Sequence, residues 1–329
     1  MQSALRPMST SQVLDRTFHF YRNHFPLLAG IGVLLPALLL LLTFAFVPLG
    51  YPPRGLALRN PFVFWTIFFE YWGSWILLYI IAHAITGGAT VYAVSRLYLG
   101  EQVTIAESYR KTLPRFWTIL RIALNIYVRV VGAGLLTIAA VVLGGYGLDF
   151  VFKYLGISSN SAQIWIGSIT VILIALAGVL WMLYLYSKYC LAIPACVLEN
   201  LPARPAVRRS RFLARDSIRR ITLIYLLMVV LGLGLSTVLW LPGQYYAIYF
   251  RRSVTTAILL RSLGSFVAGA LAGPIATIAV ALVYYDQRIR KEAFDLQFMM
   301  ESLRRPLPEQ VTSATMDTGG DSASSPQMG

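Results

Sequence analysis

The chain has 329 residues, of which 57% are apolar and 13% are charged, against about 25% charged residues in a typical soluble domain. Its mean hydropathy of +0.65 is higher than a soluble domain can expose to water, which excludes a soluble globular protein. A net charge of +14 would suggest nucleic-acid binding in a soluble protein. Here the basic residues lie between long apolar segments, so we expect no nucleic-acid partner.

Six apolar segments predict six transmembrane helices, because about 20 apolar residues cross the hydrocarbon core of a bilayer as a helix. The predicted fold is an all-α polytopic membrane domain over residues 1–305. A tail at 306–329, rich in Ser, Thr, Gly and Pro, is predicted to be disordered. The predicted spans lie near 26–49, 62–86, 119–145, 163–187, 221–243 and 263–285.

Short amphipathic segments precede the first, third and fifth spans and predict three interfacial helices. They begin near residues 10, 104 and 204, a spacing of about one hundred residues. Each is followed by two spans, which predicts a threefold parallel repeat with units at about 9–100, 103–200 and 203–300. The alternative is that any segment entering a membrane looks amphipathic, without a repeat.

The basic residues outside the spans divide unevenly between the two sides of the membrane. Segments on one side, which includes both termini, hold 21 Lys and Arg residues, and those on the other side hold six. The positive-inside rule therefore predicts that both termini are cytoplasmic.

The third amphipathic segment is the most basic and predicts contacts with lipid head groups. Near an anionic bilayer each basic side chain contributes on the order of 1 kcal/mol to membrane binding. The predicted partners are the bilayer and its anionic phospholipids. The alternative is that the arginines only set the topology. The candidate head-group contacts are Arg208, Arg211, Arg215 and Arg219.

The two charged residues that lie deepest in the predicted spans define a candidate intramembrane ion pair. Glu70 in the second span and Arg129 in the third lie at depths that differ by only about 6 Å in a core roughly 30 Å thick. Pairing would offset the cost of burying either charge alone. In the alternative, Glu70 extends to the outer surface and Arg129 to the inner surface.

A cluster of charges follows the last span and predicts that its helix continues into the cytoplasm. Asp286 with Arg290, and Lys291 with Asp295, have the i,i+4 spacing of helical ion pairs. The alternative is that the cluster pairs with the arginines of 204–220 and locks the inner face of the bundle. The cluster comprises Asp286, Arg288, Arg290, Lys291 and Glu292.

The sequence holds no recognisable catalytic or metal-binding motif. Its three histidines are His19, His24 and His83, and none has a partner at a metal-ligand spacing. His83 falls near the inner end of the second span, where we expect a packed or interfacial residue. We therefore expect no enzyme activity, no cofactor and no metal.

Three stretches carry a resemblance to a known family: LRPMSTSQVLDRTFHFYRNHF at 5–25, IPACVLENLPARPAVRRSRFLARDS at 193–217, and YYDQRIRKEAFDLQ at 284–297. Together they resemble the membrane domain associated with glycerophosphoryl diester phosphodiesterases and its stand-alone bacterial relatives. The resemblance implies a bacterial inner-membrane protein of unknown role. The family's hydrolytic activity belongs to a separate barrel domain, for which the roughly 40 residues after the last predicted span leave no room.

The favoured interpretation of the sequence is a non-enzymatic scaffold or accessory module in contact with anionic lipids. The alternative is a transporter or permease for a small or lipid-like solute, with Glu70 and Arg129 in its path. A transporter is expected to have more buried polar groups or broken spans than the sequence indicates. An intramembrane hydrolase is a third interpretation, for which the sequence offers no nucleophile–base pair.

Overall fold

The computed structural model describes residues 8–46, 61–154, 156, 160–249 and 254–292, and at 61–72, 160, 162 and 254 it describes the backbone alone. Every regular element in these ranges is a helix, which confirms the all-α prediction. The predicted tail at 306–329 lies outside the described residues. The elements are α1 (Thr10–Asn23), α2 (Phe25–Gly32), α3 (Leu34–Phe46), α4 (Pro61–Tyr98), α5 (Ile105–Thr112), the 3-10 helix η1 (Leu113–Arg115), α6 (Phe116–Tyr154), α7 (Asn160–Tyr189), α8 (Ala192–Leu198), α9 (Ala203–Ala214), α10 (Ile218–Tyr249) and α11 (Val254–Glu292).

Six helical segments are long and apolar enough to span a membrane, and the chain is a polytopic membrane protein. They correspond in order to the six predicted spans, with α2 and α3 together forming the first. Helix α11 begins at Val254, before the predicted start of the sixth span near residue 263, and therefore includes Arg261. Backbone hydrogen bonds continue a helix past a charged side chain, so a charge alone does not mark its end.

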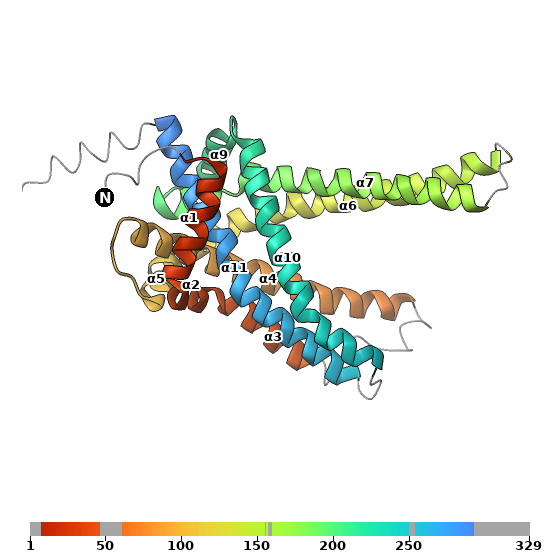
Figure 1. Cartoon of the computed structure of the whole chain (residues 1–329), viewed down its shortest axis with the longest axis horizontal. Helices are drawn as coiled ribbons and strands as arrows, with labels where there is room; N and C mark the ends of the chain where they lie inside the picture. The colour runs from red at the N-terminus through yellow and green to blue at the C-terminus, as the bar shows by residue number, and fades with distance from the viewer. Residues whose placement is uncertain (1–7, 47–60, 155, 157–159, 250–253, 293–329) are drawn as a thin grey trace, which may run out of the picture.

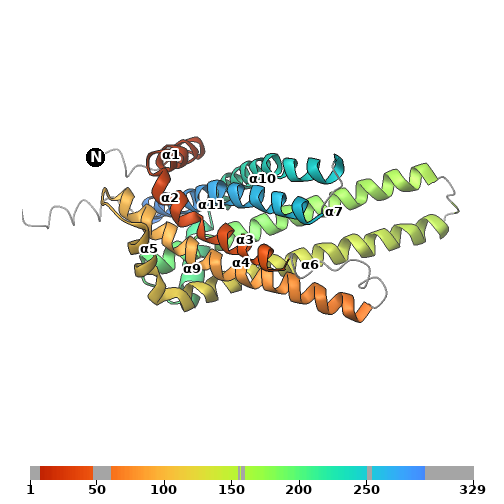
Figure 2. The same cartoon turned by 90° about the horizontal axis from the view of Figure 1, so that it is seen from below.

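Helix α11 lies at the centre of the bundle and packs against α1, α2, α3, α4, α8, α9 and α10. Helices α6 and α7 form a long antiparallel hairpin that projects away from the other spans (Figures 1 and 2). Helices α1, α5 and α9 gather at the opposite end of the molecule. We call this end the basic end. The opposite end, where the spans separate, is called the far end.

The burial of the spans follows this arrangement. In the most apolar stretches of α4 and α11, 56% and 50% of the residues are buried, against 11% in the segments that contain α6 and α7. Exposed Leu, Ile and Val side chains on the hairpin suit contact with lipid tails, which are as apolar as these side chains. The hydrophobic core therefore lies around α4 and α11.

The three amphipathic helices form where the sequence predicted them. Ser9 and Gln12 make a capping box at the start of α1, and the side chain of Thr104 accepts a hydrogen bond from the Glu107 N–H at the start of α5. The apolar face of α9 packs against the chain's own helices, with Leu213 and Ala214 fully buried. Its amphipathic pattern is therefore explained by contacts within the protein. The order of elements follows the predicted repeat, and the equivalence of the three units in space stays a prediction.

The first span is interrupted at one residue, Val33, whose backbone keeps helical angles, and the preceding Gly32 faces a proline of the central helix. Helix α2 ends at Gly32 and α3 begins at Leu34. A Cβ atom at Gly32 would lie 2.3 Å from Cγ of Pro274, so only glycine permits this approach of α2 to α11. Tyr109 of α5 donates a hydrogen bond to the Ile31 carbonyl at 2.7 Å, close to the end of α2. Pro274 interrupts the hydrogen bonding of α11 at the same level, because proline has no N–H.

Helices α10 and α11 are also in close contact near the far end. A Cβ atom at Gly264 would lie 2.1 Å from the Leu239 carbonyl oxygen of α10. Small residues allow such close packing between transmembrane helices, where dispersion forces rather than water exclusion hold the helices together.

We expect Gly264→Ala to destabilise the protein by about 1–3 kcal/mol, because the added methyl group must displace the α10 backbone. Gly234 of α10 is the matched control, since a Cβ atom there meets nothing within 4 Å. Gly234→Ala should leave stability unchanged or raise it slightly through helix propensity. Thermal unfolding of the purified variants in detergent measures both, and equal unfolding temperatures would contradict the packing argument.

Candidate functional site

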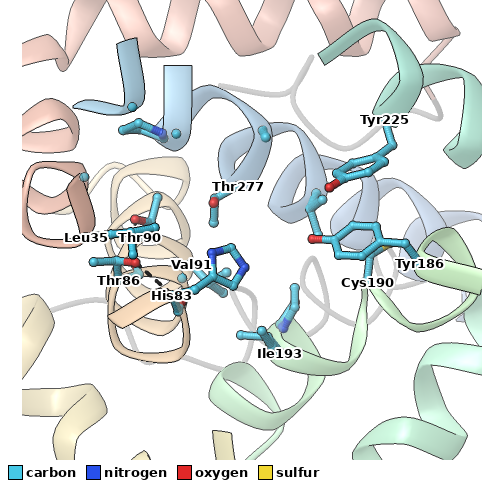
Figure 3. Close-up of a pocket in the computed structure, with 18 of the residues that line it drawn as sticks. Leu35, His83, Thr86, Thr90, Val91, Tyr186, Cys190, Ile193, Tyr225 and Thr277 are labelled. Carbon is cyan, nitrogen blue, oxygen red and sulfur yellow. Dashed lines mark hydrogen bonds between the residues drawn. The ribbon is translucent and has the colours of Figure 1, made fainter. Parts of the chain in front are cut away.

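A cavity of about 190 Å³ lies within the bundle, at the level of the interruption in the first span and of Pro274 (Figure 3). Its walls come from α2, α3, α4, α7, α8, α10 and α11. Gly87 of α4 and Gly273 of α11 border it, and a Cβ atom at either would meet no neighbouring atom within 4 Å. The absence of side chains at these two positions contributes to the open space.

His83 projects from α4 into this cavity (Figure 3). Its ring stacks on Tyr79, with the ring centroids 5.7 Å apart and the planes 4° from parallel. Tyr127 of α6 meets the same ring edge-on at 5.9 Å. Within the described part of the chain no hydrogen bond holds the imidazole of His83. The ring is therefore positioned by aromatic contacts, and its nitrogen atoms are available to a bound molecule.

Two further tyrosines form the opposite wall of the cavity. Tyr186 of α7 and Tyr225 of α10 stack with their ring centroids 4.1 Å apart and direct their hydroxyl groups toward the cavity (Figure 3). Cys190 lies beside them, and Thr277 of α11 borders the same space. No Asp, Glu, Lys or Arg is among the described residues that line the cavity. The site therefore offers hydrogen-bonding groups without a fixed charge.

A second pocket, of about 600 Å³, lies between α3, α4, α10 and α11, and we call it the outer pocket. It shares four lining residues with the His83 cavity, namely Leu35, Tyr79, Gly269 and Gly273, so the two spaces adjoin. Leucine side chains of α3 and Phe266 line it, together with Trp75, Trp240 and Arg261. A largely apolar pocket thus adjoins an uncharged polar cavity.

Of the predicted intramembrane pair, the structure describes the side chain of Arg129 and only the backbone at Glu70. The Arg129 guanidinium lies 4.5 Å from the ring centroid of Tyr189, the last residue of α7 at the basic end. This contact directs Arg129 toward the basic end. The alternative interpretation, in which Arg129 extends to the inner surface and Glu70 to the outer surface, predicts this direction for Arg129. The Glu70 side chain lies outside the described residues, and its pairing with Arg129 stays a prediction.

The arginines of the third amphipathic segment lie at the surface of the basic end. Arg208, Arg211, Arg215 and Arg219 are exposed, and no ion pair joins them to a carboxylate in the described ranges. Their contact with anionic lipid stays a prediction. Arg209 behaves differently, because it pairs with Glu199 at 3.0 Å and with Glu292.

The charge cluster after the last span pairs with the 204–220 arginines, as one of the two sequence interpretations predicted. Asp286 is fully buried and accepts hydrogen bonds from Arg220 at 2.6 Å and from Arg290 at 2.9 Å. The i,i+4 pair Asp286–Arg290 therefore forms as well. The second predicted pair, Lys291–Asp295, includes a residue outside the described ranges, and Lys291 instead contacts Asp216 at 2.8 Å.

Asp286 also fixes the N-terminal segment. The Met8 N–H donates to its carboxylate at 2.7 Å, and the guanidinium groups of Arg220 and Arg290 both donate to the Met8 carbonyl. A neighbouring network joins Arg288 to Glu292 at 3.1 Å and places Glu199 against the Tyr284 hydroxyl. Helices α1, α9, α10 and α11 are thus tied together at the basic end by charged groups.

The chain matches no protein-family model, no curated protein and no solved structure in the three comparisons made with it.

Sequence reasoning placed the candidate site on Glu70 and Arg129 and missed the residues around the cavity. A signal for it was present in α4, where Tyr79, His83, Thr86 and Thr90 recur every three or four residues and so lie on one helical face. The tyrosines of α7 and α10 had no such signal. Tyr225 is an isolated residue in an apolar span, and Tyr186 is one of three tyrosines at the end of α7. Arg261 was missed because the sixth span was predicted to begin after it.

We expect Asp286→Asn to destabilise the protein by about 3 kcal/mol, because it leaves Arg220 and Arg290 without their shared buried counter-charge. Asp216→Asn is the matched control, since that carboxylate is 73% exposed and its pair with Lys291 is accessible to water. It should leave the unfolding temperature nearly unchanged. Thermal unfolding in detergent compares the two, and a similar small effect at both positions would show that the Asp286 network does not hold the basic end together.

Proposed function

We propose that this chain is a membrane-embedded binding or transport protein for an amphipathic, lipid-like solute. The observation that supports the proposal is an uncharged polar cavity among the spans, adjoined by a largely apolar pocket. A transporter was expected to show buried polar groups or broken spans, and polar side chains such as His83 do line a cavity among the spans.

The chemistry of the two spaces favours a solute with polar and apolar parts. The cavity presents an imidazole, hydroxyl groups and a thiol, which suit a polar group without requiring a fixed charge. The outer pocket offers leucine and aromatic side chains for an apolar chain, and its volume is in the range of small-molecule sites. In the proposed path, the polar group of the solute moves between the His83 cavity and the outer pocket. The proposal assigns no chemical reaction to the chain.

The scaffold or accessory role is the second candidate, and the α6–α7 hairpin favours it. Both helices expose large apolar side chains over most of their length, including Leu135 and Leu176. Lipid tails or the helices of a partner protein would cover these faces. We also propose, from the resemblance of its sequence, that the chain is a relative of the phosphodiesterase-associated membrane domain in a bacterial inner membrane.

A larger side chain at a residue that lines both pockets is expected to block the binding of a solute. Gly273→Leu places a side chain into both spaces, whereas Gly234→Leu adds the same side chain to a position with no neighbour within 4 Å. We expect Gly273→Leu to weaken binding of lipid-like solutes by about tenfold or more, about 1.4 kcal/mol, because the added side chain occupies space that the solute needs.

Native mass spectrometry of delipidated protein, titrated with phosphatidylglycerol, phosphatidylcholine or oleate, measures this binding. Gly234→Leu should bind as the unmodified protein does, and both variants should keep its unfolding temperature. If Gly273→Leu binds all three amphiphiles as tightly as the control variant, the pockets are not the binding site and the proposal is wrong.

The proposed topology places the basic end in the cytoplasm. Lys153 at the far end and Arg211 at the basic end are both exposed, and the two native cysteines are buried. Lys153→Cys should react with a membrane-impermeant maleimide in intact cells, and Arg211→Cys only after lysis. The opposite labelling pattern would reverse the orientation.

A further inference from the structure

Arg261 is a charged residue near the start of α11, the helix that holds the sixth candidate span. It is the eighth residue of α11, about 10 Å along the helix from Val254. Its guanidinium carbon lies 5.0 Å from the ring centroid of Trp240, a residue of α10. A buried guanidinium donor without a hydrogen-bond partner is costly, so a counter-charge or a polar ligand would stabilise it.

No carboxylate of the described residues provides that counter-charge. The outer pocket contains no described Asp or Glu, and Arg261 is its one charged residue among those described. Its Nε atom is buried and has no hydrogen-bond partner. The nearby hydroxyl groups of Thr43 and Ser262 donate to carbonyls of their own helices, Leu39 and Ile258. The guanidinium therefore keeps donor groups for a molecule bound in the pocket.

The backbone that carries Arg261 is held in place by close helix packing. A Cβ atom at Gly243 of α10 would lie 2.7 Å from the Arg261 nitrogen and 3.1 Å from its Cα. The contact between Gly264 and the Leu239 carbonyl lies one turn further along α11. Because both contacts fix α11 against α10, the guanidinium stays over Trp240 at the edge of the pocket. A preformed position of this kind lowers the entropy cost of binding an anion.

The rest of the outer pocket is suited to an apolar chain. Leu35, Leu39 and Leu40 line it from α3, and Phe266 lines it from α11. Arginine presents a planar fork of donors that matches a carboxylate or a phosphate. A single cation at the edge of an apolar pocket thus complements a molecule with one acidic group and a hydrocarbon chain.

We propose that Arg261 binds the acidic head group of an amphiphile in the outer pocket, so that anionic amphiphiles are the substrate class of this protein. The inference rests on the proposed function, because it assigns a charge to the solute that the two pockets accommodate. The shared chemistry is a carboxylate or a phosphate beside a hydrocarbon chain, as in a free fatty acid or an anionic phospholipid.

The test compares Arg261→Gln and Arg261→Lys with Arg22→Gln, a control that removes an exposed arginine of α1. Each purified protein is titrated with oleate, phosphatidylglycerol and zwitterionic phosphatidylcholine, and binding is measured by native mass spectrometry. Arg261→Gln should weaken binding of the anionic probes by about tenfold or more, because hydrogen bonds between charged groups are worth at least that factor. It should leave phosphatidylcholine binding unchanged.

The Lys variant keeps the charge without the planar fork, so it should retain part of the preference for anionic probes. It also keeps the test decisive if the Gln variant does not fold. A loss with oleate alone identifies a fatty-acid carboxylate, and a loss with phosphatidylglycerol alone identifies a phospholipid with a net negative charge. Either supports the inference.

Two negative results are distinguishable. If amphiphiles bind and Gly273→Leu blocks them, but the Arg261 variants bind all three probes as the Arg22 control does, the charge preference is overturned. The proposed function then stands. If the unmodified protein binds none of the probes more tightly than Gly273→Leu does, the proposed function itself fails.

Discussion

The buried carboxylate of Asp286 is the interaction on which the arrangement of the basic end depends. It meets two arginines and a backbone N–H, which come from α10, from α11 itself and from the segment before α1. A buried carboxylate without these partners would be unstable, and so would either arginine without the carboxylate. Because α11 is also the central span, the segments fixed to Asp286 hold their positions around the helix that lines both pockets.

The cavity results from helix irregularities at one level of the bundle. The first span has a one-residue interruption at Val33, between Gly32 and Leu34. Pro274 interrupts hydrogen bonding in α11 at the point where Gly32 approaches it. Gly87 and Gly273 present no side chain to the same space. Close packing normally fills a helix bundle, so a space of this size requires that side chains are missing from several helices together.

The electrostatics of the molecule separate its two ends. At the basic end, described carboxylates compensate the arginines that approach the core, such as Arg209 and Arg220, while Arg208 and Arg211 face outward. At the far end of the bundle, Arg261 lies among apolar side chains and contacts the Trp240 ring. The arginines near the core of the basic end are therefore neutralised within the chain, whereas Arg261 has a place for an external anion.

The sequence by itself determined the six spans, the amphipathic helices and the charge cluster at 286–292, because hydropathy and helical periodicity are local properties of the chain. It left open whether that cluster pairs within its own helix or with the arginines of 204–220, and the structure contains both kinds of pair. Only the tertiary structure decided that His83, Tyr186 and Tyr225 share one cavity, because they come from three helices far apart in sequence. The position of Arg261 was also a tertiary result: α11 starts before the charge, and only packing against α10 shows which residues surround it.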